Sequence, residues 1–304
     1  MFQLRLAGQV GLRLLLASAA IVAGVQAFRL LLLPAIVSVF HPGEALTSFL
    51  RRIGILSFLL LSYWAYVRFY EKRKVDELRP TPRGIAIGGL TGAGLILLAA
   101  LLLFALGAYE VTAYRGMQDG LLSAAGLIVV AAMLEEVVYR GILFRVLENA
   151  WGTAIALFLQ SLLFGLGHLE NIEDGASTVE LITTVVSVTL VGAFWTLVFV
   201  LSRNLWVVAA NHAAWNFSII LTGVPLSGLG DWVSLAPIAS RYQGPDWLTG
   251  GRFGPESSLI TMVLVSAALA VLWTLARSRD RLVKAQAQGI DGVDGMVRRP
   301  HTPN

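Results

Sequence analysis

Long apolar runs constrain this chain more than any other feature of its sequence. The run LLSAAGLIVVAAM at residues 121–133, for example, contains no charged residue. A helix that crosses the hydrocarbon core of a bilayer needs about 20 largely apolar residues. Such segments occur at about 14–39, 53–70, 84–109, 120–144, 152–171, 180–201, 204–224 and 257–277. Because the runs are long and do not alternate as membrane strands do, we predict an all-α polytopic membrane protein with about eight transmembrane helices.

The composition and the domain organisation agree with this class. Of the 304 residues, 56% are hydrophobic and 14% are charged, whereas soluble domains are about 25% charged. The absence of cysteine excludes disulfides, thiolate metal sites and a cysteine nucleophile. We expect one integral membrane domain at residues 1–278, with its motifs at about 120–220. A disordered cytoplasmic tail is expected at 279–304, where charged residues mix with Gly and Pro.

Charges outside the apolar segments indicate the orientation. The linker at 71–83 and the chain after residue 278 are rich in basic residues, whereas the linker at 170–180 carries acidic residues and no cation. Since cytoplasmic loops carry the positive excess, we predict that both termini are cytoplasmic. Arg51 and Arg52 oppose this rule, because the predicted span boundaries place them in an outer loop.

The basic linker also bears on partners and source. We interpret it as a topogenic or lipid-headgroup patch, and we expect no nucleic-acid binding. Of the 23 basic residues only Lys72, Lys74 and Lys284 are lysine. Such a strong arginine bias indicates a GC-rich bacterial genome, and therefore a bacterial plasma membrane.

Three charged residues stand inside one apolar segment, in LEEVVYR at 134–140. A charge at the centre of a membrane helix costs roughly 2.5–3.5 kcal/mol on insertion scales, so such residues are candidates for function. Glu136 and Arg140 are spaced i, i+4 and predict an ion pair with the acid on the favourable N-terminal side. Glu135 lies about 100° around the helix. It therefore needs another role, and a general base is the one we expect.

Two further apolar segments contain histidine. FGLGH places Phe164 and His168 four residues apart, and NHAAWN places His212 and Asn216 four residues apart. If these helices pack against the one with Glu135, their polar groups converge in a cavity with apolar walls. In simple alternation Glu135 lies toward the inner half of its span and His168 toward the outer half, so convergence requires tilted or offset helices. Taken singly, each motif also fits a plain packing role or interhelical hydrogen bonding.

The three motifs together resemble those of a known family. EEVVYR fits E-E-x-x-x-R, FGLGH fits F-x-x-x-H and HAAWN fits H-x-x-x-N, in this order. Over about residues 120–220 the sequence resembles the CPBP family, which contains the CAAX prenyl protease Rce1 and bacterial CAAX amino-terminal or abortive-infection proteins. The resemblance implies an intramembrane glutamic endopeptidase with eight helices and a conical active-site cavity between the fourth, fifth and seventh spans.

The resemblance also implies roles for individual residues. Carried over by position, the catalytic residues are Glu135, His168, His212 and Asn216, and the supporting residues are Glu136 and Arg140. Glu135 would activate water with help from His168, while His212 and Asn216 would form the oxyanion site. The expected partners are membrane lipid and a membrane-associated protein or peptide substrate. No cofactor is expected, and no prenylated substrate is implied for a bacterial chain.

Other functions remain open from the sequence. Glu135, His168 and His212 could instead bind a divalent metal, since two histidines and one carboxylate with an open position form a catalytic metal site. The same charges could serve a proton- or ion-coupled transporter. A third alternative is a catalytically silent immunity or chaperone scaffold. The G-x-G-D sequence that ends at Asp231 lies in a Gly-rich loop and is interpreted as chance.

Overall fold

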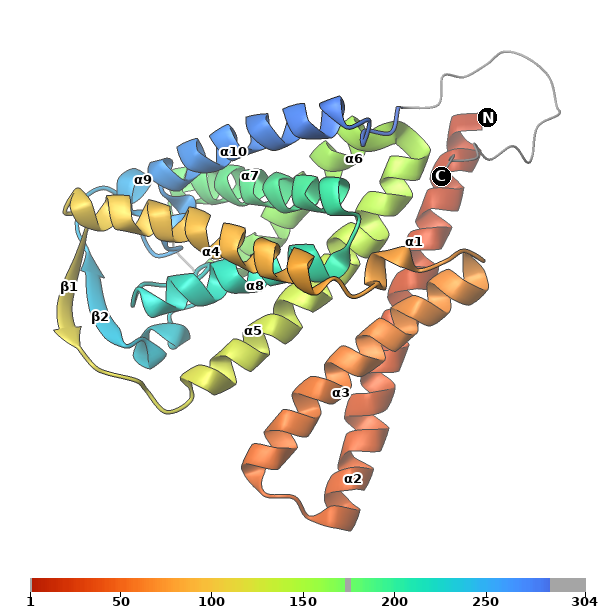
Figure 1. The fold of residues 1–304 in the computed structure, drawn as a ribbon, viewed down its shortest axis with the longest axis horizontal. Helices are drawn as coiled ribbons and strands as arrows, with labels where there is room; N and C mark the ends of the chain where they lie inside the picture. Colours follow the sequence, from red (N-terminus) through yellow and green to blue (C-terminus); the bar gives the residue numbers. More distant parts are fainter. Residues whose placement is uncertain (1, 173–175, 285–304) are drawn as a thin grey trace.

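The computed structural model describes residues 2–172 and 176–284 and consists almost entirely of helices (Figure 1). The α-helices are α1 (Phe2–Ala27), α2 (Leu33–Phe40), α3 (Glu44–Ala65), α4 (Pro82–Ala105), α5 (Leu121–Glu136), α6 (Arg145–Gly167), α7 (Thr178–Ser202), α8 (Leu205–Leu221), α9 (Asp246–Thr249) and α10 (Leu259–Ser278). Strands β1 (Tyr109–Tyr114) and β2 (Ile238–Tyr242) pair antiparallel. Short π-helices continue α1, α3 and α5. The prediction of an all-α polytopic membrane protein is confirmed.

The division into spans differs from the prediction. Within the described residues, six helices are long and apolar enough to cross a membrane, and Leu205–Leu221 is a shorter apolar helix. The expected segments 120–144 and 152–171 form one helical run of 51 residues, Leu121–Asn171. Gly152 interrupts this run with φ 79° and ψ 169°, at the point where the sequence predicted a new span. Glycine allows the break because it adopts positive φ without steric cost.

The helices are arranged as a bundle with an arm. In Figure 1, α4, α7, α8 and α10 run alongside one another, and α5 crosses them obliquely. Helices α1, α2 and α3 form the arm at one side. Arg51 and Arg52 lie inside α3 and not in the expected loop, because this helix already begins at Glu44. Arg52 donates a hydrogen bond of 2.5 Å to the Ser123 hydroxyl of α5.

Helices α4 and α8 pack very closely, which fixes the position of α8. A Cβ atom added at Gly92 would lie 2.1 Å from the Asn211 carbonyl oxygen, so only glycine permits this approach. The Asn211 side chain also donates a hydrogen bond of 3.0 Å to Thr91 of α4. His212, the next residue along α8, is thereby held at a defined depth in the bundle.

The two basic segments lie at the same end of the bundle. Asn204, at the start of α8, donates to the Arg79 carbonyl of the basic linker at 2.7 Å, and Arg203 donates to the Arg281 carbonyl at 3.0 Å. Residues 279–284 of the expected tail are described, and Val283 exchanges hydrogen bonds with Thr153. The rest of the predicted disordered tail lies outside the described residues. Its location in the cytoplasm and the bacterial source remain predictions.

Candidate active site

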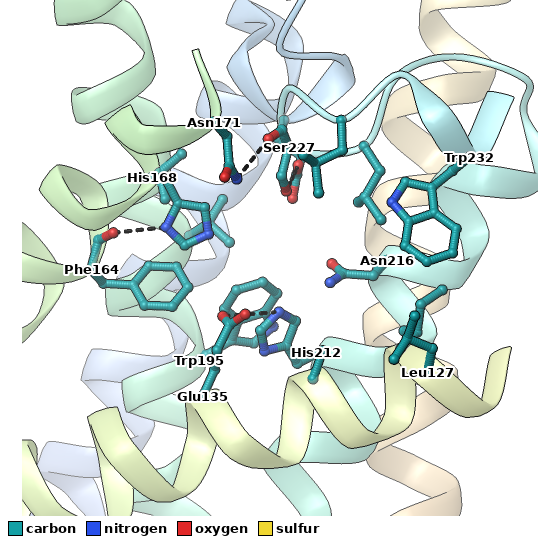
Figure 2. Close-up of a pocket in the computed structure, with 17 residues that line it drawn as sticks. Leu127, Glu135, Phe164, His168, Asn171, Trp195, His212, Asn216, Ser227 and Trp232 are labelled. Carbon is teal, nitrogen blue, oxygen red and sulfur yellow. Dashed lines mark hydrogen bonds and ion pairs between the residues drawn. The ribbon is translucent and has the colours of Figure 1, made fainter. Parts of the chain in front are cut away.

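A cavity of about 110 Å³ lies among α5, α6, α7 and α8 (Figure 2). The segment 222–258, between α8 and α10, covers it. The polar residues that line the cavity are Glu135, His168, Asn171, His212, Asn216, Ser227 and Glu256. The structure thus brings all four residues expected to be catalytic into one space. The cavity lies between the fourth, fifth and seventh expected spans, where the active site was predicted, and α7 adds a further wall.

The oblique course of α5 explains how Glu135 and His168 reach the same cavity. His168 stands directly after the end of α6, and Glu135 stands near the end of α5. Antiparallel helices without tilt would keep these residues apart. In Figure 1 α5 instead crosses the bundle, and the π-helix Val137–Phe144 follows it. Such π-helical segments occur frequently at functional sites.

Glu136 and Arg140 form the ion pair that their spacing predicts. The Arg140 Nη1 atom lies 3.0 Å from Glu136 Oε1, and both side chains are fully buried. Arg140 also donates to Thr196 Oγ1 at 3.2 Å and to the Gly192 carbonyl at 2.8 Å, both on α7. A buried ion pair is stable only when its remaining donors are satisfied in this way. The pair therefore joins the end of α5 to α7.

His212 is held by Glu136 and by Trp195. Its Nδ1 atom lies 2.8 Å from Glu136 Oε1. Because a carboxylate paired with Arg140 can only accept, we assign the proton to Nδ1. The other ring nitrogen, Nε2, lies 3.9 Å from Glu135 Oε2. The Trp195 ring stacks on the imidazole with centroids 3.6 Å apart. The contacts leave Nε2 turned toward Glu135.

His168 has the same arrangement with a different partner. Its Nδ1 atom lies 2.8 Å from the Phe164 carbonyl oxygen. A carbonyl oxygen only accepts, so Nδ1 carries the proton and Nε2 of the neutral ring is an acceptor. Phe164 also packs against the imidazole, with ring centroids 4.5 Å apart. His168 therefore suits a role as acceptor for a water O–H group.

Glu135 and Asn216 each carry a side-chain oxygen that has no hydrogen-bond partner among residues 2–172 and 176–284. The Glu135 side chain is 31% exposed, in contrast to the fully buried Glu136. Glu135 Oε2 and Asn216 Oδ1 are both buried atoms without a hydrogen-bond partner within the described residues. In Figure 2 both side chains point into the cavity. Unpaired buried polar atoms are costly, and in a cavity they are the groups that a bound molecule would satisfy.

Several lining residues were missed by the sequence reasoning. Trp195 gives no signal in its apolar run, because its role depends on stacking across helices. Ser227 and Glu256 lie between the last two expected spans, and Asn171 lies at the very end of the expected span 152–171, so none of them stood out as a site residue. Asp231, which the sequence reasoning set aside, is exposed and does not line the cavity.

The alternative of a metal site receives no support from the side-chain arrangement. In the part of the chain that the structure describes, no group of three or more His, Asp and Glu side chains is positioned to hold a metal ion. Glu135, His168 and His212 share the cavity, but they do not form such a group.

The fold and the cavity define a helical integral membrane protein with a polar site between its spans. Residues 116–218 match the model of the family described as type II CAAX prenyl endopeptidase Rce1-like. The match confirms the family resemblance that the three motifs indicated. It covers all six residues expected to be catalytic or supporting. No curated protein matches the chain, and no solved structure matches it.

Proposed function

We propose that this protein hydrolyses a peptide bond of a membrane-associated protein or peptide, with Glu135 as the general base. One observation carries the proposal. Glu135 is a cavity carboxylate that stands outside the Glu136–Arg140 pair, while histidines from two other helices line the same space. A carboxylate without a cationic partner is free to accept a proton from a water molecule bound beside it.

The proposed reaction begins with a water molecule between Glu135 and His168. Glu135 accepts one proton from the water, and His168 Nε2 accepts a hydrogen bond from its other O–H group. The oxygen attacks the carbonyl carbon of the peptide bond and forms a tetrahedral oxyanion. Glu135 then delivers its proton to the peptide nitrogen, and the C–N bond breaks. The products are a carboxylic acid and an amine.

His212 and Asn216 would stabilise the oxyanion. Asn216 can donate through its amide NH2 group. His212 Nε2 can donate only when the ring carries both protons, because Nδ1 is held by Glu136. The contact with Glu136 holds the ring so that Nε2 faces the cavity, which gives the buried ion pair a purpose beyond packing. Loss of one oxyanion donor typically lowers the rate by about 10²–10³.

The test uses purified protein in proteoliposomes and a mixture of synthetic peptides, with new peptide termini identified by mass spectrometry. We expect cleavage by the wild type and by Asp231→Asn, a control at an exposed acid outside the cavity. Glu135→Gln should lower the rate by about 10²–10⁴, the usual contribution of a general base. Equal cleavage by wild type and Glu135→Gln contradicts the proposal.

Further measurements on the same variants, in proteoliposomes and in cells, separate the alternatives. Proton or ion flux without any Glu135-dependent cleavage would favour a transporter. A cellular phenotype that survives Glu135→Gln would favour a silent scaffold. If a chelator abolishes cleavage and Zn²⁺ restores it, Glu135, His168 and His212 are to be assigned as metal ligands.

A further inference from the structure

A second carboxylate lines the cavity from outside the family-matched region. Glu256 belongs to the short 3₁₀-helix Pro255–Ser257, just before α10, and its exposed fraction is 4%. It lines the same cavity as Glu135. The family match ends at residue 218, so the match assigns no role to this acid. The proposed mechanism does not use it either.

The hydrogen bonds of Glu256 come from neutral donors. Trp215 Nε1 donates to Glu256 Oε1 at 3.0 Å, and Ser227 Oγ donates to Oε2 at 2.6 Å. Trp215 is fully buried and directly precedes Asn216 in α8. Indole and hydroxyl donors orient a carboxylate without cancelling its charge. Each oxygen also keeps a second lone pair for a further donor.

The lining of the cavity contains acids but no strong cation. Glu135 and Glu256 both line it, and no Lys or Arg does so within the described residues. The nearby charge of Glu136 is already balanced by Arg140. The unpaired atoms in the lining, Glu135 Oε2 and Asn216 Oδ1, are acceptors. The cavity therefore offers more acceptors and negative charge than its own donors satisfy.

The two acids lie on opposite sides of the cavity. In Figure 2 Ser227 and Asn171 lie across the open space from Glu135. Glu256 is hydrogen-bonded to Ser227, which places it on that far side, within the covering segment 222–258. A peptide bond at Glu135 would consequently direct a neighbouring side chain toward Glu256.

We propose that Glu256 is a specificity-determining residue that binds a basic side chain of the substrate next to the cleaved bond. This inference rests on the proposed endopeptidase function. A Lys or Arg side chain would donate charge-assisted hydrogen bonds to Glu256 in a site shielded from water. An acidic side chain, or a free terminal carboxylate, at that position would meet like charge and is disfavoured.

The experiment compares matched peptides. The peptide mixture first supplies a sequence that the wild type cleaves, and each residue flanking the cleaved bond is then replaced by Lys, norleucine or Glu. Norleucine resembles Lys in shape but has no charge. At one of these positions the wild type should cleave the Lys peptide about 10- to 100-fold faster than the norleucine peptide, which corresponds to one charged hydrogen bond. The Glu peptide should be the slowest.

Variants distinguish recognition from structural support. Glu256→Gln keeps groups for Trp215 and Ser227 but removes the charge, so it should lose the preference for Lys while it still cleaves the norleucine peptide. Glu256→Asp keeps the charge and should retain part of the preference. Asp231→Asn, which alters an exposed acid outside the cavity, should behave as the wild type.

Several results overturn the inference. One is that the wild type shows Glu135-dependent cleavage but no preference for a basic residue. This result is obtained without any variant at Glu256. A second is an unchanged preference in Glu256→Gln. A third is an equal loss of cleavage of all three peptides in Glu256→Gln, which would indicate a purely structural role for Glu256. Absence of any Glu135-dependent cleavage instead defeats the proposed function itself, and the inference with it.

Discussion

Two clusters of acidic residues in this protein differ in how their charges are balanced. At the basic end, the linker cluster consists of Tyr63, Glu71, Arg73, Glu77 and Arg145. Arg73 donates to both Glu77 oxygens, at 2.6 and 3.0 Å, and Arg145 reaches Glu77 Oε1 at 3.2 Å. In the cavity, Glu135 has only His212 Nε2 at 3.9 Å as an ion-pair neighbour among the described residues.

This difference separates a structural acid, Glu77, from the proposed general base, Glu135. Burial by itself would raise the pKa of Glu77, but hydrogen bonds from Arg73 and the charge of Arg145 outweigh it, so the pKa lies below its usual value of 4.5. Glu77 thus stays ionised and ties the linker to α3 and α6. Arg73, expected to belong to a lipid-facing basic patch, serves here as an internal partner. Glu135 lacks such partners and remains available to exchange a proton.

The largest effect is expected from paired variants of the two acids. Glu135→Gln should lower peptide cleavage by about 10²–10⁴ and leave the unfolding transition in detergent unchanged. Glu77→Gln should lower the unfolding temperature and leave the activity of the folded fraction near that of wild type. Peptide cleavage and thermal unfolding, measured on the same preparations, check both. The comparison fails if the two variants exchange these phenotypes.

Variants at Arg140 test the Glu136–Arg140 ion pair beside the cavity. Arg140→Met leaves Glu136 buried without a cation, which typically costs 3–5 kcal/mol. We expect lower folded yield and a strong loss of stability in detergent. The double variant Glu136→Gln/Arg140→Met should recover part of that stability but no activity, because His212 loses the charge that holds it. Full activity in the double variant would contradict the assigned role of Glu136.

A substitution of Asn216 tests the proposed oxyanion site, and its expected effect is smaller. Asn216→Ala should lower kcat by about 10²–10³ and change KM little, since the donor acts mainly on the transition state. Ser218→Ala, at a buried polar residue on the same helix that does not line the cavity, is the matched control. Steady-state kinetics with one cleaved peptide provide both constants. A rise in KM alone would assign Asn216 to substrate binding.

The smallest effect concerns acid sensitivity of the linker cluster. Because the pKa of Glu77 is lowered on folding, its contribution to stability is complete above the unfolded value of 4.5. That contribution disappears as the pH falls through the lower folded value. Charged hydrogen bonds of this kind contribute about 1.5–3 kcal/mol. The unfolding temperature, measured between pH 7 and pH 3, should fall less steeply with decreasing pH in Glu77→Gln than in wild type. Equal slopes would contradict the assigned role of Glu77.

The sequence predicted those parts of the site that depend on local spacing. Glu136–Arg140 and His212–Asn216 follow from helical periodicity, and the three motifs placed Glu135 and His168 beside them. Arg73 and Glu77 are also four residues apart, but residues 71–75 are not helical, so helical periodicity does not predict this contact. Span boundaries were less accurate, because α3 begins with polar residues outside the apolar run.

Contacts between distant segments could not be predicted in the same way. Glu256 reaches the cavity only because the segment 222–258 folds over it and is fastened by Asn171 and Ser227. Trp195 acts through a ring stack between α7 and α8. Neither contact leaves a periodic pattern in the sequence, since each depends on how nonlocal elements pack.

The most direct test of the difference between the two acids is comparative peptidomics of membranes. Cells would carry wild type, Glu135→Gln or Glu77→Gln, with the membrane level of each protein adjusted to be equal. We predict cleaved fragments with wild type and Glu77→Gln, and none with Glu135→Gln. The new termini would also reveal whether basic residues flank the cleaved bond. Identical fragments in all three membranes would contradict the assignment of Glu135 as the catalytic base.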